Sequence, residues 1–427
     1  MKRYNYIIAL FTIFIGMNSC RDKYTEVFTA YSPVYMSYED LREAVKKTGP
    51  RDMVNTGKIY FKDDFIYINE ELKGIHIIDN SNPSNPQNIG FVEIPGNVDI
   101  AIKNDILYAD SYIDLVAINI ANPGNITEVH RVEKVFPYTV PPTDDKYRVA
   151  KVDEDKGVVV DWEVKQVRQE MEYHYYPVYF GIKAEMDYRA NAPVSGGAMP
   201  SGSTFGVGGS MARFGLYNEY LYAVDKNKLY MFDVSTPSIP VDIGTQNVGW
   251  DIETMFIYDG HMFLGTQSGM RIYSLKVPTV PEYIGQFWHV TSCDPVVISN
   301  GYAYVTLRGG TRCGSNVNRL DIIKLSADYT DNELLASYPM QGPYGLGIDD
   351  DILFVCDGDA GLKVYDVKDK LNLQNNQLAV FLGINTYDVI PLNGNLFMIG
   401  DDGFYQYDYS DIQNITQLSF IPVVKED

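Results

Sequence analysis

Apolar and polar positions along most of the chain follow the short-period pattern of β-strands. From Gly57 onward, short apolar or alternating runs are separated by turns that contain Asn, Asp or Gly. The unit is strand, tight turn, strand, Gly-containing turn, strand ending near Asp, Pro-containing loop and strand. The stretch from Gly74 to Ser111 contains the end of one such unit, with Asn-Pro turns after Asp79, and the start of the next.

Seven copies of this unit recur at intervals of roughly 40 residues. Four short strands joined by hairpin turns favour antiparallel meanders over a solenoid, so the repeat predicts an all-β fold, a β-propeller of four-stranded antiparallel blades. Seven copies favour seven blades, and six or eight are the alternatives because terminal units can be split to close a ring. The copies are Lys58–Ile94, Val98–Val132, Ala212–Val248, Ile252–Val290, Pro295–Tyr338, Tyr344–Leu382 and Tyr387–Val423.

Two segments depart from the repeat. Before it, Arg21 to Ala30 has the composition of a polar tether, and Ser37 caps a predicted short helix from Tyr38 to about Lys47. An insertion, residues 133–211, separates the second and third copies. It contains a predicted strand or ribbon, GVVVDWEVKQV, and a Gly/Ser-rich end interpreted as a linker. Such an insertion is either a disordered flap or a lid or partner-binding arm. The predicted domains are 20–56 for tether and helix and 57–423 for the propeller.

The first residues have the pattern of a processing segment. Lys2 and Arg3 precede the apolar run Tyr6–Met17, which is too short to span a bilayer as a mature helix. The following Asn18-Ser19-Cys20 resembles the lipobox of bacterial lipoproteins. The resemblance implies that residues 1–19 are a signal peptide, that Cys20 is acylated, and that the chain is an outer-membrane lipoprotein on the surface or periplasmic side of the cell envelope. The alternative is an ordinary signal peptide with an incidental cysteine.

Several strings in the repeat resemble a named family. Gly74-Ile-His-Ile-Ile-Asp79, Gly361-Leu-Lys-Val-Tyr-Asp366 and Leu229-Tyr-Met-Phe-Asp-Val-Ser-Thr-Pro237 resemble the LVIVD repeat of bacterial cell-surface propeller proteins. The resemblance covers Gly57 to Val423 apart from the insertion. It departs in the fifth copy, where Thr311 to Asn318 lengthens a loop. It implies a surface-located, non-enzymatic propeller and does not specify a ligand.

Composition and charge restrict the classes of function. The chain has 34 Tyr against 3 Trp, which favours half-exposed β-surfaces. The net charge of −21 argues against binding to nucleic acid and against adsorption on anionic membranes. No Gly-x-Ser-x-Gly elbow, His-Glu-x-x-His motif or phosphate-binding glycine loop is present. The sequence therefore predicts no catalytic residues and no organic cofactor.

The first strand of each propeller blade lines the central channel, so the residues at its start surround one opening. Several carboxylates at that opening would suit a hard cation such as Ca²⁺ or a hydroxyl-rich ligand. The alternative is that they only satisfy turn chemistry at the strand starts. Nearby aromatic residues are available for stacking. The candidate ligand-binding residues are Asp99, Glu253, Asp294, Asp388, Tyr344, Trp250 and Trp288.

With Cys20 assigned to lipid, three cysteines remain. Cys293 precedes the first strand of copy five and Cys313 lies in a later loop of the same copy, so a disulfide between them is predicted in an oxidising compartment. A metal site with Cys356 and His289, or free thiols, are the alternatives.

The main hypothesis is a lipid-anchored, extracytoplasmic binding or scaffolding propeller that recognises a glycan or protein partner through its channel opening. The first alternative is a metal-dependent hydrolase or lyase that uses the carboxylates at that opening. The second is an assembly factor for envelope proteins.

Overall fold

The computed structural model describes residues 24–144, 146–171, 207–208, 213–288, 295–309 and 317–424. Four of the predicted functional residues, Cys20, Cys293, Asp294 and Cys313, lie outside these ranges, so the lipid anchor and the disulfide stay predictions. The chain divides into two compact units, Met1–Met36 with Thr139–Phe180, and Ser37–Tyr138 with Gly181–Asp427. No helix in the described ranges is long and apolar enough to cross a membrane.

The first unit is a long antiparallel β-ribbon. β1 (Tyr24–Met36) pairs with β12 (Val158–Met171) along its whole length, and β11 (Arg148–Val149) adds a short parallel pairing to β1. A 3₁₀ turn, η1 (Glu154–Lys156), precedes β12. The strand predicted in GVVVDWEVKQV is therefore present. Residues 24–30, in contrast, were expected to be a tether and are strand, because their partner lies far along the chain and local composition cannot reveal it.

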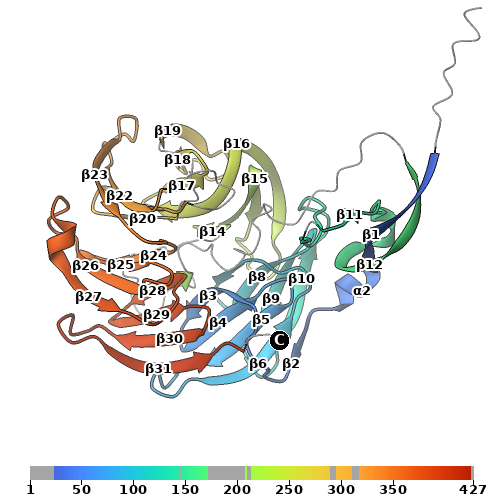
Figure 1. Ribbon diagram of the computed structural model, residues 1–427, viewed down its shortest axis with the longest axis horizontal. Coiled ribbons are helices and arrows are strands. Elements are labelled where there is room, and N and C mark those ends of the chain that lie inside the picture. The colour runs from blue at the N-terminus through green and yellow to red at the C-terminus, as the bar shows by residue number, and fades with distance from the viewer. Residues whose placement is uncertain are drawn as a thin grey trace, which may run out of the picture. The chain divides into compact units, whose positions relative to one another are not determined.

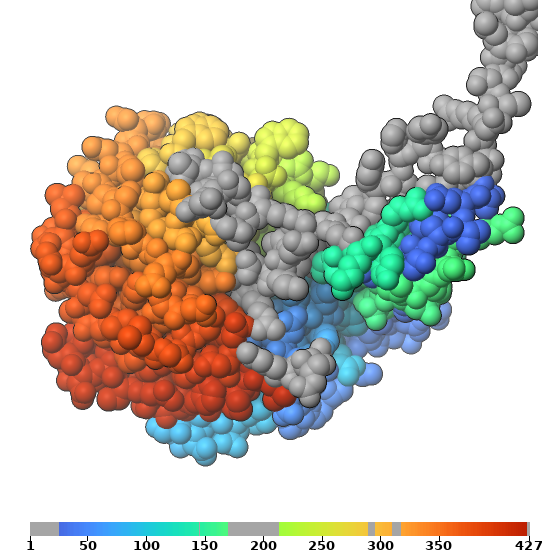
Figure 2. Space-filling model, viewed as in Figure 1, coloured from blue at the N-terminus to red at the C-terminus, as the bar shows by residue number. Residues whose placement is uncertain are grey.

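The second unit is a seven-bladed propeller, and its sheets follow one another around a ring (Figure 1). Each blade has four antiparallel strands in chain order. The first strands of neighbouring blades, such as β20 with β24 and β24 with β28, contact each other and line the middle of the ring. In Figure 2 the blades coloured from yellow through orange to red are direct neighbours, so adjacent copies in the sequence are adjacent in space. The predicted fold class is confirmed.

The strand bounds follow the repeat closely. Blade 1 has β3 (Thr56–Lys62), β4 (Phe65–Glu70), β5 (Gly74–Asp79) and β6 (Gln87–Glu93). Blade 2 has β7 (Ile100–Lys103), β8 (Ile106–Ser111), β9 (Asp114–Asn119) and β10 (Thr127–Val132). Blade 5 has β20 (Val296–Ser299), β21 (Tyr302–Leu307), β22 (Arg319–Lys324) and β23 (Glu333–Pro339). Blade 6 has β24 (Leu346–Asp349), β25 (Ile352–Cys356), β26 (Leu362–Asp366), η2 (Leu373–Asn376) and β27 (Gln377–Phe381). Blade 7 has β28 (Asp388–Leu392), β29 (Asn395–Ile399), β30 (Gly403–Asp408) and β31 (Thr416–Pro422).

Blades 3 and 4 contain two long strands, β15 (Tyr220–Asp233) within blade 3 and β16 (Val241–Tyr258), which runs from blade 3 into blade 4. β14 (Phe214–Tyr217) pairs with the first part of β15, and the last part of β15 pairs with the first part of β16. The last part of β16 begins blade 4 and pairs with β17 (His261–Thr266). β18 (Gly269–Ser274) and β19 (Glu282–Trp288) complete that blade. One hydrogen-bonded sheet therefore contains two blades.

One backbone hydrogen bond marks every blade and fixes the count at seven. The N–H just after the third strand donates to a carbonyl in the turn between the first two strands, at 2.7–2.9 Å. The seven bonds run from Asn80 to Asp64, Ile120 to Asp105, Val234 to Glu219, Leu275 to Gly260, Leu325 to Gly301, Val367 to Asp351 and Tyr409 to Gly394. Each predicted copy thus forms one complete blade.

The core lies between the blades, because a blade's inner strands are buried on both faces. In β4, Tyr67 packs with blade 2, whereas Ile66 and Ile68 pack with Phe397 and Phe404 of blade 7. Side chains alternate across a strand, so a run of consecutive apolar residues serves both neighbouring blades. Burying each such side chain contributes about 1.5–3 kcal/mol.

The ring closes without splitting a blade. Met53, just before blade 1, forms a parallel bridge with Val423 after β31, and the Val424 N–H donates to the Met53 carbonyl at 2.7 Å. Gln406 Nε2 of blade 7 donates to Asn80 Oδ1 of blade 1 at 2.7 Å. Met53 is almost fully buried at the same junction.

The predicted N-terminal helix is present but shorter than expected. α2 (Tyr38–Glu43) begins at Ser37, whose side chain accepts a hydrogen bond from the Asp40 N–H at 3.0 Å. It ends at Glu43 and not near Lys47, because β2 (Lys46–Thr48) pairs with the outer edge of β6. The pairing needs an extended backbone that a continued helix would exclude.

Candidate functional site

One end of the ring carries the starts of the first strands and the turns between the second and third strands; we call it the pore-mouth face. Here one described residue from each blade stands at or near the start of the first strand, and these seven residues are not uniformly acidic. Lys58 and Arg213 stand at the same repeat position as Asp99, seven residues ahead of the second strand. Neither cation was among the predicted site residues, although the fixed distance to the second strand identifies both positions. The seven residues are Lys58, Asp99, Arg213, Glu253, Pro295, Gly345 and Asp388.

Asp99 joins three blades. Its side chain is almost completely buried, and its Oδ2 lies 3.1 Å from Lys58 Nζ of blade 1. Oδ1 accepts from the Tyr60 hydroxyl at 3.2 Å, and Oδ2 also accepts from the Arg213 N–H and, at 2.9 Å, the Phe214 N–H of blade 3. Both oxygens therefore accept hydrogen bonds from the protein. Burial lowers the pKa of Lys58, and the Asp99 carboxylate opposes that effect.

A second carboxylate, Asp110 in β8, supports the turn that presents Asp99. Its Oδ1 accepts from the Val98 N–H at 2.8 Å, the Asp99 N–H at 3.0 Å and Asn97 Nδ2 at 2.9 Å. Burial raises the pKa of Asp110 to about 6, although the two backbone N–H groups act in the opposite direction. Asp110 could not be predicted as a supporting residue, because its position at the end of a strand does not reveal which turn it holds.

Glu253 is a second buried carboxylate on this face whose pKa is raised. Only 7% of the residue is exposed, and Gln267 Nε2 donates to its Oε1 at 3.1 Å. Burial raises the pKa of Glu253 to about 7, against the lowering effect of Gln267, Arg213 and Arg308. The carboxyl group of Glu253 therefore changes between its protonated and ionised forms near neutral pH. It sits at an irregularity between Ile252 and Thr254, where β16 shifts register against β17.

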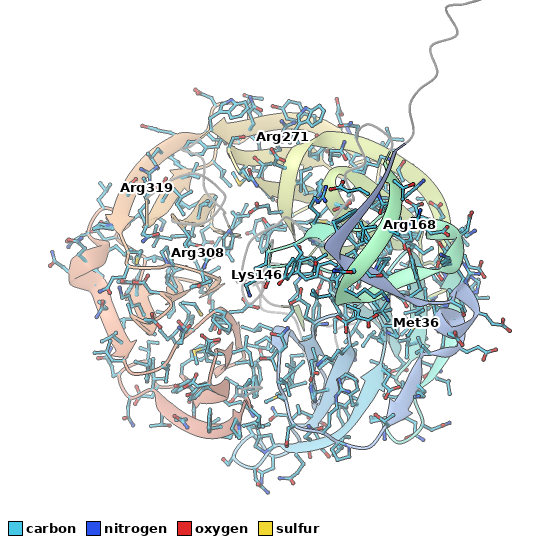
Figure 3. The ribbon with its side chains drawn as sticks, turned by 45° about the vertical axis from the view of Figure 1, so that its right-hand side comes forward. Met36, Lys146, Arg168, Arg271, Arg308 and Arg319 are labelled. Carbon is cyan, nitrogen blue, oxygen red and sulfur yellow. The ribbon has the colours of Figure 1, made fainter. Side chains whose placement is uncertain are left out.

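Aromatic rings and a cation meet on blades 5 to 7. The Arg308 guanidinium lies 4.0 Å from the centroid of the Tyr344 ring, and the Tyr344 and Tyr387 rings are 5.6 Å apart. Thr306 Oγ1 of blade 5 donates to the Tyr344 carbonyl at 2.6 Å, and this bond holds the segment just before β24 of blade 6. In Figure 3, Arg308 lies nearer the middle of the ring than Arg319. Tyr344, predicted as a ligand-stacking residue, therefore stands beside a cation at the inner rim.

Asp388 is buried near blade 1 and blade 6. It is 3% exposed, and its charge contributes to raising the pKa of Tyr60 and of Cys356, although burial is the main cause for both. Cys356 is a fully buried free cysteine with a pKa far above the ordinary value, so its thiol is unreactive. Asp99 and Asp388 are thus placed on the same face, both close enough to interact with Tyr60.

Within the described ranges, no three His, Cys, Asp or Glu side chains form a group that could hold a metal ion. Asp294 lies outside those ranges. Ca²⁺ binding at the pore mouth therefore stays a prediction.

The two predicted tryptophans lie farther out on the pore-mouth face. Trp250 is in β16 where the chain passes from blade 3 to blade 4, and Trp288 ends β19, the outermost strand of blade 4. They are 71% and 58% exposed. At the junction of blades 3 and 4, the outer part of this face therefore carries two exposed indoles.

Part of the insertion contributes to the channel wall. β13 (Val207–Gly208) pairs with β3 on the edge away from β4, opposite Phe61 and Tyr60. This segment belongs to the glycine-rich stretch that was expected to be a linker. Its backbone adds a short strand to blade 1.

Comparison with known proteins agrees with the repeat pattern. The LVIVD repeat family matches residues 55–93 and 208–248. No curated protein matches the chain by sequence. Solved structures with a similar arrangement include the computationally designed Ika8 protein, with 9% identity, a TM-score of 0.48, and coverage of 88% of this chain and 93% of that one. A protein from Lactobacillus plantarum has 12% identity, a TM-score of 0.44 and coverage of 89% and 87%. BamB from Moraxella catarrhalis has 10% identity, a TM-score of 0.44 and coverage of 85% and 98%.

Proposed function

We propose that this chain, a β-propeller that carries LVIVD repeats, is a lipid-anchored binding module of the bacterial cell envelope. It recognises a protein or glycan partner through the pore-mouth face. The occupied oxygens of Asp99 favour this role over a hydrolase or lyase, because a metal or substrate there would have to displace bonds that join three blades.

The observation that carries the proposal is the contrast between the two faces of the ring. On the face opposite the pore mouth, the same side-chain bond recurs: an Asp or Asn that ends or follows the third strand accepts from the backbone N–H two residues on, at 2.8–3.0 Å. These residues are Asp79, Asn119, Asp233, Asp366 and Asp408. On the pore-mouth face, corresponding positions differ in charge and size from blade to blade. A surface that must only fold can repeat, whereas a surface that recognises a partner needs specific differences.

A pair of substitutions on blade 6 tests the recognition surface. Tyr344→Ala removes the ring beneath Arg308, and we expect roughly tenfold weaker capture of the partner, as for other aromatic interface anchors. Leu371→Ala, on the opposite face of the same blade, removes a side chain that is 68% exposed and should leave capture unchanged. The measurement is in-cell cross-linking of the full chain, followed by quantitative mass spectrometry of the captured partners. Capture that is equal for Tyr344→Ala and the native chain, or no partner above background, would contradict the proposal.

The lipid anchor is tested separately at Cys20. Without its thiol no acyl chain can attach, so Cys20→Ser should lose label from radioactive palmitate and move from the membrane fraction to the soluble fraction. Cys356→Ala, which keeps Cys20, serves as the control and should stay labelled and membrane-bound. A Cys20→Ser chain that still carries label and sediments with membranes would show that the anchor lies elsewhere.

A further inference from the structure

Two strongly exposed indoles lie at the junction of blades 3 and 4. Trp250 is 71% and Trp288 58% exposed, whereas tryptophan in folded proteins normally buries most of its surface. The chain's third tryptophan, Trp162, belongs to the other unit, and its Nε1 donates to the Pro141 carbonyl at 2.8 Å. The junction of blades 3 and 4 thus carries both tryptophans of the propeller unit, and both are strongly exposed.

Arg271 of β18 is a neighbour of both tryptophan positions. It pairs with Gln286, and Gly269 pairs with Trp288, so Arg271 and Trp288 project from the same face of blade 4. Diagonal neighbours of this kind lie about 7–8 Å apart. In Figure 3, Arg271 lies farther from the middle of the ring than Arg308.

The backbone beside Trp250 is shaped to receive the guanidinium. A Cβ at Gly249 would lie 2.3 Å from Arg271 Nη1, and Gly249 has a φ of +124°. Only glycine permits this contact and this conformation. Arg271 Nη1 and the Tyr273 hydroxyl both donate to the Val248 carbonyl, at 3.4 and 2.9 Å, which holds blade 4 against blade 3. The guanidinium thus lies directly on the backbone that carries Trp250.

The surroundings of the indoles are polar. The Gly249 N–H donates to Asn247 Oδ1 at 3.1 Å, Gln286 lies opposite Arg271, and Ser268 stands in the turn before β18. These groups beside the indoles can donate and accept hydrogen bonds, as the hydroxyls of a sugar require.

We propose that Trp250, Arg271 and Trp288 form a subsite for a neutral saccharide. The C–H faces of sugar rings would stack on the indoles, and the guanidinium would donate hydrogen bonds to sugar hydroxyls. The net charge of −21 repels a polyanionic chain, which selects a neutral ligand over an acidic one. The inference rests on the proposed binding function and names the ligand class at the outer rim of the same face.

Affinity electrophoresis of the full chain through gels containing starch, mannan, xylan or β-1,3-glucan tests the proposal. We expect retardation by at least one of these polymers, and a loss of affinity of roughly tenfold or more in Trp250→Ala and in Trp288→Ala. Arg271→Gln should weaken retention, whereas Lys276→Gln, the same change of charge on the opposite face of blade 4, should not. In a Trp162→Phe chain, a change of tryptophan emission on addition of the retained polymer then reports directly on the two remaining indoles.

Three outcomes would overturn the saccharide assignment. These are no retardation by any neutral polymer, stronger retention by polygalacturonate than by the neutral polymers, or retention that both tryptophan substitutions leave intact. Partner capture that depends on Tyr344, in a chain that no polymer retards, would refute the subsite while leaving the proposed function in place. If no polymer retards the chain and partner capture does not depend on Tyr344, both the saccharide subsite and the proposed function are refuted.

Discussion

Replacing Asp99 with alanine is expected to lower the free energy of unfolding by about 3–5 kcal/mol. The substitution leaves the ammonium group of Lys58, whose side chain is only 9% exposed, without its carboxylate partner. It also removes the acceptor of the Arg213 and Phe214 N–H groups, which ties blade 3 to blade 2. A buried charge without a counter-charge costs far more than the pair contributes when intact, so the effect should exceed that of a surface charge change.

Chemical denaturation of the native chain, Asp99→Ala and a matched control measures the effect. Asp105→Ala removes the same charge from an exposed turn of the same blade and should change stability by about 0.5 kcal/mol or less. Adding Lys58→Met to Asp99→Ala should recover part of the loss, because the uncompensated cation is then absent. If Asp99→Ala costs no more than Asp105→Ala, Asp99 does not join the blades as described.

The blades could be predicted because their determinants are local. A strand of six residues and a turn with Asn, Asp or Gly are encoded by neighbouring positions, and the same order recurs in each copy. The bond between the residue after the third strand and the first turn, such as Asn80 to Asp64, spans one hairpin and is set by that order. The number of blades could therefore be predicted from the seven copies alone, without knowing how the blades pack into a ring.

Pairings between distant segments could not be predicted in the same way. β1 finds its partner in β12, β2 adds to the outer edge of β6, and β13 adds to the inner edge of β3. Each of these strands borders a blade or ribbon whose open edge has backbone groups to satisfy, and any extended segment of adequate length can satisfy them. The sequence of Lys46–Thr48 or Val207–Gly208 does not specify which edge it meets.

The sequence predicted where the pore mouth lies, but it predicted only some of the charged residues there. The repeat located the strand starts, and so it located Asp99, Glu253 and Asp388. It did not show that Lys58 and Arg213 occupy equivalent positions, because the residue type at this position changes from blade to blade. Nor could it show that the Asp99 carboxylate accepts bonds from two other blades, since this depends on how the blades pack.

Stability of the native chain relative to Glu253→Gln is expected to fall as pH rises from about 4.5 to about 7. Burial raises the pKa of Glu253 from 4.5 to about 7, so between these values the folded chain keeps a proton that the unfolded chain has lost. The protonated Glu253 makes its full contribution to the free energy of unfolding below pH 4.5. This contribution decreases between pH 4.5 and pH 7 and is absent above pH 7. The two pKa values correspond to a change of about 3 kcal/mol.

The measurement compares denaturation midpoints of the native chain and Glu253→Gln from pH 4 to pH 8, with the difference plotted against pH. Glutamine keeps an oxygen acceptor for Gln267 but cannot ionise, and other titrating groups such as Asp110 are present in both proteins and cancel. Glu282→Gln, at an exposed position of the same blade, should follow the native curve. A flat difference curve for Glu253→Gln would mean that Arg213 and Arg308 stabilise the carboxylate enough to offset its burial. The inner rim would then carry a permanent negative charge at neutral pH, and its affinity for a partner would show no dependence on this group between pH 5 and pH 8.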